Sequence, residues 1–302
     1  MFSILFKNNF FLLIILSSIW GSAFLGIKIA VDSISPISVV SFRLIIGAII
    51  LLIYFKIKGN YFNFNIKTYF YIFLCALFGN FIPFYLISWS ELYIPSNLAG
   101  LLLSVAPIFA IVLSHIFTND DKFNFLKLLG VIIGLIGAIF LIGYKDIFLV
   151  FSNDYKMVIP KIAVIIAALG YVISSIIAYN LKNINTVSIT TITTIFAAII
   201  SIPFMLYYEI NYFSVPTKNS IIAIIYLGIM PTAVAFLLRF YLINKAGPVF
   251  LSYVAYLIPI FSIFWGYLIL KEIVLINQLI AIFFIFIGIY VGQKGSNAKR
   301  DL

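Results

Sequence analysis

The chain has 302 residues, of which 64% are hydrophobic and only 9% are charged, and its formal net charge is +10. Soluble globular proteins have about 25% charged residues, because their surface must be largely polar. A water-soluble domain of this size could not hide so much apolar surface, whereas the core of a lipid bilayer is itself apolar. The composition therefore predicts an integral membrane protein. It also disfavours nucleic-acid binding, because the basic residues lie in short loops between apolar runs.

Membrane-spanning helices are predicted wherever about 20 mostly apolar residues follow one another. Such runs occur ten times: Phe10–Val31, Pro36–Phe55, Thr68–Ser90, Pro95–Phe117, Phe125–Tyr144, Pro160–Tyr179, Val187–Tyr208, Ser220–Ile243, Pro248–Leu270 and Leu275–Gln293. The first resembles a signal peptide but exceeds the roughly 7–15 apolar residues of a signal sequence, so we expect an uncleaved span. Runs this long exclude a β-barrel, whose strands alternate over about ten residues. We expect an all-α polytopic membrane protein with ten transmembrane helices.

A polar segment at residues 147–159 divides the ten predicted spans into two sets of five, at residues 1–146 and 160–302. SVAPIF (Ser104–Phe109) in the first half aligns with YLIPIF (Tyr256–Phe261) in the second, at an offset of 256 − 104 = 152 residues. Because five is odd, the second repeat must be inverted relative to the first. Inverted repeats with a binding site near the membrane midplane recur in secondary transporters.

The last predicted span of each half contains two glycines four residues apart. They are Gly130 and Gly134 in the first half, and Gly288 and Gly292 in the second. This spacing lets helices approach closely.

The loop charges predict the orientation, since cytoplasmic loops carry the excess of basic residues. If the N-terminus is cytoplasmic, that side receives eleven: Lys7, Lys56, Lys58, Lys67, Lys122, Lys127, Lys182, Lys245, Lys294, Lys299 and Arg300. The opposite side receives six: Lys28, Lys145, Lys156, Lys161, Lys218 and Lys271. The difference predicts both termini in the cytoplasm, with the protein in the cell (inner) membrane.

Four stretches resemble the EamA-like family of the drug/metabolite transporter superfamily. They are WGSAFLGIKIAV and SFRLIIGAIILL in the first two spans, SVAPIFAIVL in the fourth, and residues 227–272 with their Gly-Pro turn and Leu-Lys-Glu ending. The resemblance implies a carrier that moves a small organic metabolite by alternating access, with export the favoured direction. An amino acid or a related anion is one candidate. Asp120, where the family commonly has Glu, and Phe236, where it has Tyr, depart from the pattern.

Two arginines lie inside predicted spans. Arg43 lies seven residues into the second span, about 10 Å deep at 1.5 Å per residue. Since arginine is costly in hydrocarbon, it should face a cavity or a partner. It either docks a substrate carboxylate or phosphate, or it binds helix-end carbonyls or extends to the interface. Arg239 lies four residues before a span end. Its side chain could extend to the cytoplasmic surface, which would explain its position without a role in function.

Other polar and aromatic residues inside the spans are candidates to line a substrate cavity. Together with Arg43 they are Trp20, Ser22, Asn80, Tyr85, Ser104, Tyr171, Thr232, Tyr253 and Tyr256. The alternative for each is hydrogen bonding between helices. Four prolines within spans are candidate kinks or hinges, namely Pro83, Pro107, Pro231 and Pro259. Proline is, however, also simply frequent in membrane helices.

Catalytic and metal-binding patterns are sparse. None of the nine acidic residues lies near the middle of a predicted span, and the single histidine, His115, lies near a span end. The single cysteine, Cys75, excludes an intrachain disulfide and a CxxC metal site. We expect no cofactor, no metal and no enzymatic activity. No GxxxxGK[ST] loop for an ATPase is present.

The remaining alternatives are a channel-like facilitator and, more remotely, a membrane-embedded transferase. The expected partners are the lipid bilayer and a small-molecule substrate, with a homodimer left open.

Overall fold

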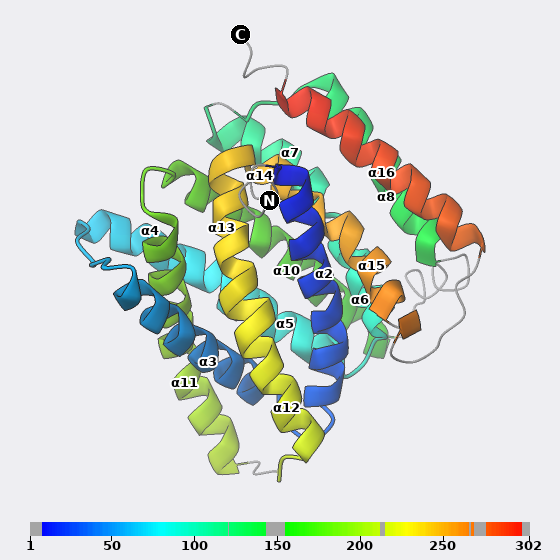
Figure 1. Cartoon of the computed structure of the whole chain (residues 1–302). Helices are drawn as coiled ribbons and strands as arrows, with labels where there is room; N and C mark the ends of the chain where they lie inside the picture. Colours follow the sequence, from blue (N-terminus) through cyan, green and yellow to red (C-terminus); the bar gives the residue numbers. More distant parts are fainter. Residues whose placement is uncertain are drawn as a thin grey trace.

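The computed structural model describes residues 8–119, 121–142, 155–211, 215–265, 267–268 and 276–297. All regular secondary structure in these ranges is helical, which confirms the all-α prediction (Figure 1). The helices are α2 (Asn9–Ala30), α3 (Pro36–Ile57), α4 (Ile66–Ala76), η1 (Leu77–Phe81), α5 (Ile82–Ser90), α6 (Ser96–Leu103), α7 (Ala106–Phe117), α8 (Phe125–Ile142), α10 (Tyr155–Asn180), α11 (Thr186–Asn211), α12 (Lys218–Leu227), η2 (Gly228–Val234), α13 (Ala235–Ala246), α14 (Pro248–Ser252), α15 (Val254–Trp265) and α16 (Ile276–Asn297). The elements η1 and η2 are π-helical turns that join the α-helices on either side of them into one continuous helix.

Eight helical stretches in the described residues are long and apolar enough to cross a membrane. Two further apolar helices, Phe125–Phe140 and Ile280–Gly295, are shorter, so the full set of ten spans stays a prediction. The helix predicted to begin at Pro160 begins at Tyr155 instead, and this proline lies inside α10. Of the predicted central segment, residues 147–154 lie outside the described residues.

Polar residues directly before apolar runs start several helices. Their side-chain oxygens accept a hydrogen bond from a backbone N–H in the first turn, which would otherwise lack a partner. The residues are Asn8 before α2, Ser35 before α3, Asn65 before α4 and Thr217 before α12. Gly247, with φ +89°, makes the sharp turn between α13 and α14, a conformation that side chains with a Cβ rarely adopt.

The second helix of each predicted half packs against its counterpart, in antiparallel orientation. Ser41 near the start of α3 donates to the carbonyl of Ser201 near the end of α11, at 3.2 Å. At the other end of the pair, Thr191 donates to the carbonyl of Leu51, at 3.4 Å. The contacts therefore run in opposite directions along the two helices.

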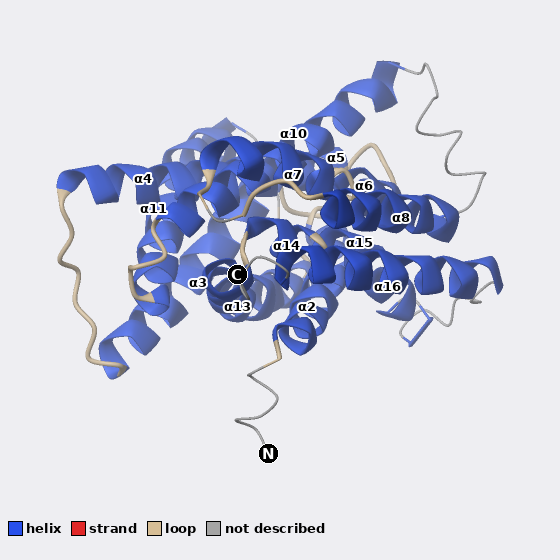
Figure 2. Cartoon of the chain, turned by 90° about the horizontal axis from the view of Figure 1, so that it is seen from above, coloured by secondary structure: helices blue, strands red, loops and turns tan. Residues whose placement is uncertain are grey.

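The fifth helices, α8 and α16, lie side by side in the same way (Figures 1 and 2). A Cβ atom at Gly130 would lie 2.5 Å from the carbonyl oxygen of Gly288, and one at Gly288 would lie 2.5 Å from the amide of Gly134. Only glycine allows the two backbones to approach this closely. Antiparallel packing again brings the start of one helix to the end of the other.

Several other helix contacts correspond between the two predicted halves. The first helix, α2, packs on α12, α13 and α15, and its counterpart α10 packs on α4, α5 and α7. The third helix of each half contains a π-helical turn, η1 in the first and η2 in the second. The fourth helix of each half is interrupted, between α6 and α7 and between α14 and α15. Pro107 directly follows the break between α6 and α7, whereas Pro259 lies inside α15, six residues after the break at Tyr253.

The glycine contact between α8 and α16 generates a stability prediction. We expect Gly130→Ala to lower the melting temperature of the purified protein in detergent. The added methyl group forces the helices apart, and overpacking costs about 1–3 kcal/mol. Gly100→Ala is the matched control, because its nearest neighbouring atom lies 3.8 Å from the position of the new Cβ. Equal melting temperatures for the two variants would contradict the close packing.

Candidate functional site

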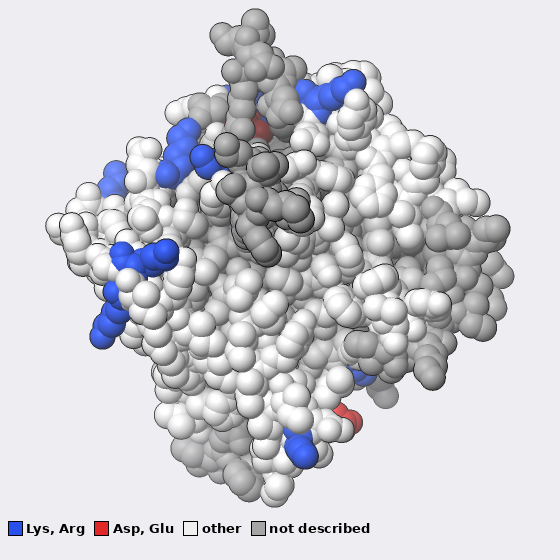
Figure 3. All heavy atoms as spheres, viewed as in Figure 1, with Lys and Arg blue, Asp and Glu red and all other residues white. Residues whose placement is uncertain are grey.

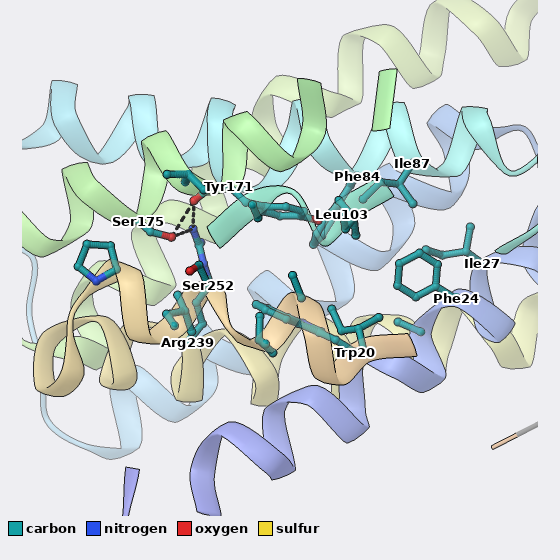
Figure 4. Close-up of a pocket in the computed structure, with 18 of the residues that line it drawn as sticks. Trp20, Phe24, Ile27, Phe84, Ile87, Leu103, Tyr171, Ser175, Arg239 and Ser252 are labelled. Carbon is teal, nitrogen blue, oxygen red and sulfur yellow. Dashed lines mark hydrogen bonds between the residues drawn. The ribbon is translucent and has the colours of Figure 1, made fainter. Parts of the chain in front are cut away.

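A cavity of about 90 Å³ lies between the two predicted halves (Figure 4). Helices α2, α3, α5, α6 and α7 contribute to it from the first half, and α10, α13, α14 and α15 from the second. Most of its wall is apolar, with residues such as Phe24, Ile27, Phe84, Ile87 and Leu103. The polar exceptions are few: Trp20, Arg43, Tyr171, Ser175, Arg239 and Ser252. An apolar cavity with a few converging polar groups is typical of small-molecule binding sites.

Arg43 lies at this cavity with 2% of its surface exposed. Its Nε donates to the hydroxyl of Thr232 at 3.1 Å, and its guanidinium carbon lies 3.8 Å from the centre of the Phe84 ring. Thr232 in turn donates to the carbonyl of Leu227 at 2.8 Å, inside the region of η2. No described carboxylate lies within 4 Å of Arg43, and its terminal nitrogens have no described hydrogen-bond partner. The side chain therefore does not extend to the interface.

The prediction that Arg239 extends to the cytoplasmic surface is wrong. The side chain is 1% exposed and points into the bundle, where it meets α10. Its Nη2 lies 3.0 Å from the hydroxyl of Ser174. It also lies 3.3 Å from the hydroxyl of Ser175 and 3.4 Å from the carbonyl of Tyr171 (Figure 4). Because α10 packs directly against α13, the oxygens of α10 are nearer to the guanidinium group than the membrane interface is.

The second terminal nitrogen of Arg239, Nη1, is buried and has no hydrogen-bond partner among the described residues. The rings of Phe236 and Phe240 flank the guanidinium, each with its centre 5.2 Å from the central carbon. Aromatic faces attract cations and supply part of the compensation that a carboxylate would otherwise give. The charge of Arg239 is thus held by rings and neutral oxygens.

Trp20 and Tyr171 form a stacked aromatic pair in the cavity wall. Their ring centres are 6.4 Å apart with a 24° angle between the planes. The indole Nε1 of Trp20 donates to the carbonyl of Pro231 at 3.1 Å, within η2. The π-helical turn thereby fixes the orientation of a residue that lines the cavity.

Two other predicted cavity residues, Ser22 and Ser104, instead form hydrogen bonds to neighbouring helices. Ser22 lies 2.5 Å from the hydroxyl of Tyr226, and Ser104 donates to the carbonyl of Ala255 at 3.2 Å. Neither serine is part of the cavity wall. Both hydroxyl groups therefore form hydrogen bonds between neighbouring helices, which was the alternative to lining the cavity.

Four more of the predicted residues lie away from the cavity. Tyr256 donates to the carbonyl of Val131 at 2.8 Å, and Tyr85 lies on the outer surface of the bundle with 37% exposure. Asn80, in η1, and the hydroxyl of Tyr253 are buried without a described hydrogen-bond partner. Of the ten candidates, the structure brings Trp20, Arg43 and Tyr171 together at the cavity, with Thr232 directly behind Arg43.

Sequence analysis did not identify the serines that surround Arg239. Ser174 and Ser175 lie in the middle of an otherwise apolar run, and this interruption is the signal that could have found them. The described residues contain no group of three or more His, Cys, Asp or Glu that could hold a metal ion.

Comparison with known proteins shows to which family a chain with this architecture belongs. The sequence profile of the EamA-like transporter family matches residues 9–143 and again residues 159–291. The uncharacterized transporter YoaV of Bacillus subtilis (strain 168) is 23% identical over 277 residues, covering 90% of this chain and 92% of the relative. An uncharacterized transporter of Archaeoglobus fulgidus is 26% identical over 284 residues, covering 90% and 94%. A crystal structure of another protein superposes with a TM-score of 0.76 at 15% identity, covering 97% of this chain and 98% of that chain, which shows a shared fold.

The apolar helices and these relatives define an integral, multi-pass membrane protein of the transporter class. The chain belongs to the EamA-like transporter family, as the resemblance predicted.

The contacts of Arg239 generate a second prediction. We expect Ser174→Ala to destabilise the protein, because its hydroxyl both accepts from Arg239 and donates to the carbonyl of Cys75 at 3.2 Å. A hydrogen bond to a charged group contributes about 1.5–3 kcal/mol. Thermal unfolding in detergent measures the loss. Ser17→Ala is the control, because this buried serine binds only the carbonyl of Leu13 in its own helix. If Ser17→Ala lowered the melting temperature as much as Ser174→Ala does, the contact with the guanidinium group of Arg239 would not explain the loss of stability.

Proposed function

We propose that this protein is a secondary carrier that moves a small organic anion across the membrane through the cavity between its two halves. One observation carries the proposal: two buried guanidinium groups, Arg43 and Arg239, lie at a mostly apolar cavity with no described carboxylate within 4 Å of either. Burying an unpaired charge costs several kcal/mol, even after the protein relaxes. A substrate with an acidic group would supply the missing partner, and its apolar part would fit the aromatic wall.

The size of the cavity supports alternating access. A volume of about 90 Å³ holds several water molecules but is smaller than the roughly 150 Å³ of an engineered cavity that binds benzene. A metabolite with more than a few heavy atoms therefore requires the surrounding helices to move apart. The interrupted helices and the prolines Pro83, Pro107, Pro231 and Pro259 are candidate hinges for this movement.

We propose that residues 1–146 and 160–302 form two inverted five-helix repeats. The two matches of the family profile, the antiparallel pairs α3–α11 and α8–α16, and the paired π-helical turns all support this arrangement. In an inverted repeat, equivalent helices run in opposite directions, and the binding site lies at the interface of the two repeats. The cavity is lined by helices of both halves, which is consistent with this arrangement.

The charge distribution supports cytoplasmic termini. Figure 3 shows basic side chains along the upper and left margins of this face, where the start of α2, the end of α16 and the α3–α4 loop lie, and fewer along its lower edge. Between them, the described atoms of this face form a wide band of uncharged residues. By the excess of basic residues, the upper end faces the cytoplasm of a cell (inner) membrane. Export remains the favoured direction by family resemblance.

A channel-like facilitator is the second candidate function, and a homodimer remains open. A continuous pore would conduct without saturating, whereas a carrier saturates because each substrate molecule requires one conformational cycle. The family assignment supports a transporter in preference to a membrane-embedded transferase.

Counterflow in proteoliposomes tests the carrier. With a panel of organic acids and their uncharged amides, we expect saturable exchange of one or more acids and none of the matching amides. Arg43→Ala should reduce anion exchange about tenfold or more, because a hydrogen bond to a charged group contributes about 1.5–3 kcal/mol. Lys58→Ala, which removes an exposed cation away from the cavity, should leave exchange unchanged. Equal exchange of acids by Arg43→Ala and the unaltered protein would refute the docking role of Arg43.

A further inference from the structure

A buried carboxyl group lies at the end of the bundle opposite the start of α2. Glu91 directly follows α5, and its side chain is fully buried. Its Oε2 accepts a hydrogen bond from Ser96, the first residue of α6, at 3.2 Å. Its Oε1 is buried and has no hydrogen-bond partner among the described residues. Half of this carboxyl group therefore lacks the compensation that a buried carboxylate requires.

The neighbouring cations do not form an ion pair with Glu91. The Nζ of Lys28, on α2, donates to the backbone carbonyl of Glu91 at 2.8 Å, so the ammonium is directed to the main chain. An ion pair does join Lys127 and Asp121, but it lies far from this position in the fold. Lys28 and Arg43 still act on the carboxyl group electrostatically, from α2 and α3.

The other elements around Glu91 contribute serine hydroxyl groups and one further cation. Ser96 comes from α6, and Ser90 binds the carbonyl of Pro160 on α10 at 3.0 Å. The next residue on α10, Lys161, is a buried cation at this end of the bundle. Burial raises the pKa of Glu91 from 4.5 to about 8, although Ser96, Lys28 and Arg43 act in the opposite direction. The carboxyl group is therefore protonated below about pH 8 and ionised above it.

We infer that the Glu91 carboxyl is a proton-binding site that controls how strongly Arg43 binds the anionic substrate. This inference rests on the proposed function. When Glu91 is protonated, the positive charge of Arg43 is uncompensated and available to an anion. When Glu91 is ionised, its negative charge lowers the positive potential at Arg43 and repels the substrate.

The consequence is a coupling between proton and anion. If proton binding at Glu91 strengthens anion binding, then anion binding must strengthen proton binding by the same factor. The two ligands therefore favour each other, and transport in which they move in the same direction becomes dependent on the pH difference across the membrane. A carboxyl group near the middle of a span is not needed for this coupling. Glu91 lies at a span end, so its position in the sequence does not by itself indicate this role.

Anion affinity measured against pH tests the inference. Benzoate is the probe, because it combines one carboxylate with an apolar ring, and benzamide is its uncharged counterpart. Trp20 lines the cavity, so its fluorescence reports occupancy when Trp89 and Trp265 are replaced by Phe. Between pH 6 and 9, we expect benzoate affinity to fall severalfold as pH rises through about 8. The Glu91→Gln variant, which stays neutral, should retain the low-pH affinity across this range.

Asp32→Asn is the matched control, because this exposed carboxylate lies at the same end of the molecule as Glu91. Its pH profile should follow that of the unaltered protein. A pH dependence in Glu91→Gln equal to that of the unaltered protein would overturn the inference.

A second measurement separates this inference from the proposed function. Infrared difference spectra of the purified protein should show a protonated carboxyl band at pH 6.5 that disappears above pH 8 and is missing in Glu91→Gln. Absence of that band from the unaltered protein would overturn proton binding at Glu91 even if anions bind. Absence of binding of every anion at every pH would refute the proposed function, while the infrared titration would still decide whether Glu91 binds a proton.

Discussion

The structure depends on how two guanidinium groups are held inside an apolar helix bundle without an acidic partner. Arg43 is held by one hydroxyl and one aromatic face, and Arg239 by two serines, a backbone carbonyl and two rings. These neutral groups offset part of the desolvation cost but leave nitrogen atoms unpaired. Both side chains therefore have unpaired nitrogen atoms at the cavity, and in the proposed function an anionic substrate is their partner.

Irregular backbone supplies the polar contacts around these charges. The π-helical turn η2 contains Thr232, which binds Arg43, and Pro231, whose carbonyl binds Trp20. A proline inside a helix leaves a carbonyl without its usual partner, and in lipid such a group must be satisfied by a neighbour or line a cavity. The breaks that interrupt the helices therefore also position the residues of the site. The π-helical turn η1 of the first half, by contrast, contributes no residue to the cavity wall.

The helical fold could be predicted from hydropathy alone, because lipid requires each backbone polar group to be satisfied within its own helix. For Arg43, depth in the span favoured a cavity or a partner but left extension to the interface open, and the structure decides between them by burying the side chain. Arg239 could not be predicted in the same way. It lies one turn from a span end, and only the tertiary contact between α13 and α10 shows that serines compete with the interface for its charge. The direction of tyrosine and serine side chains likewise depends on helix rotation, so Tyr85 and Ser104 lie outside the cavity while Tyr171 lines it.

A structure of the protein in a lipid nanodisc with a transported organic anion bound tests the central claim most directly. The account predicts that the acidic group lies about 2.7–3.2 Å from the terminal nitrogens of Arg43, with the apolar part of the ligand against Trp20 and Tyr171. An acidic group bound elsewhere, with both guanidinium groups in their present contacts, would contradict it.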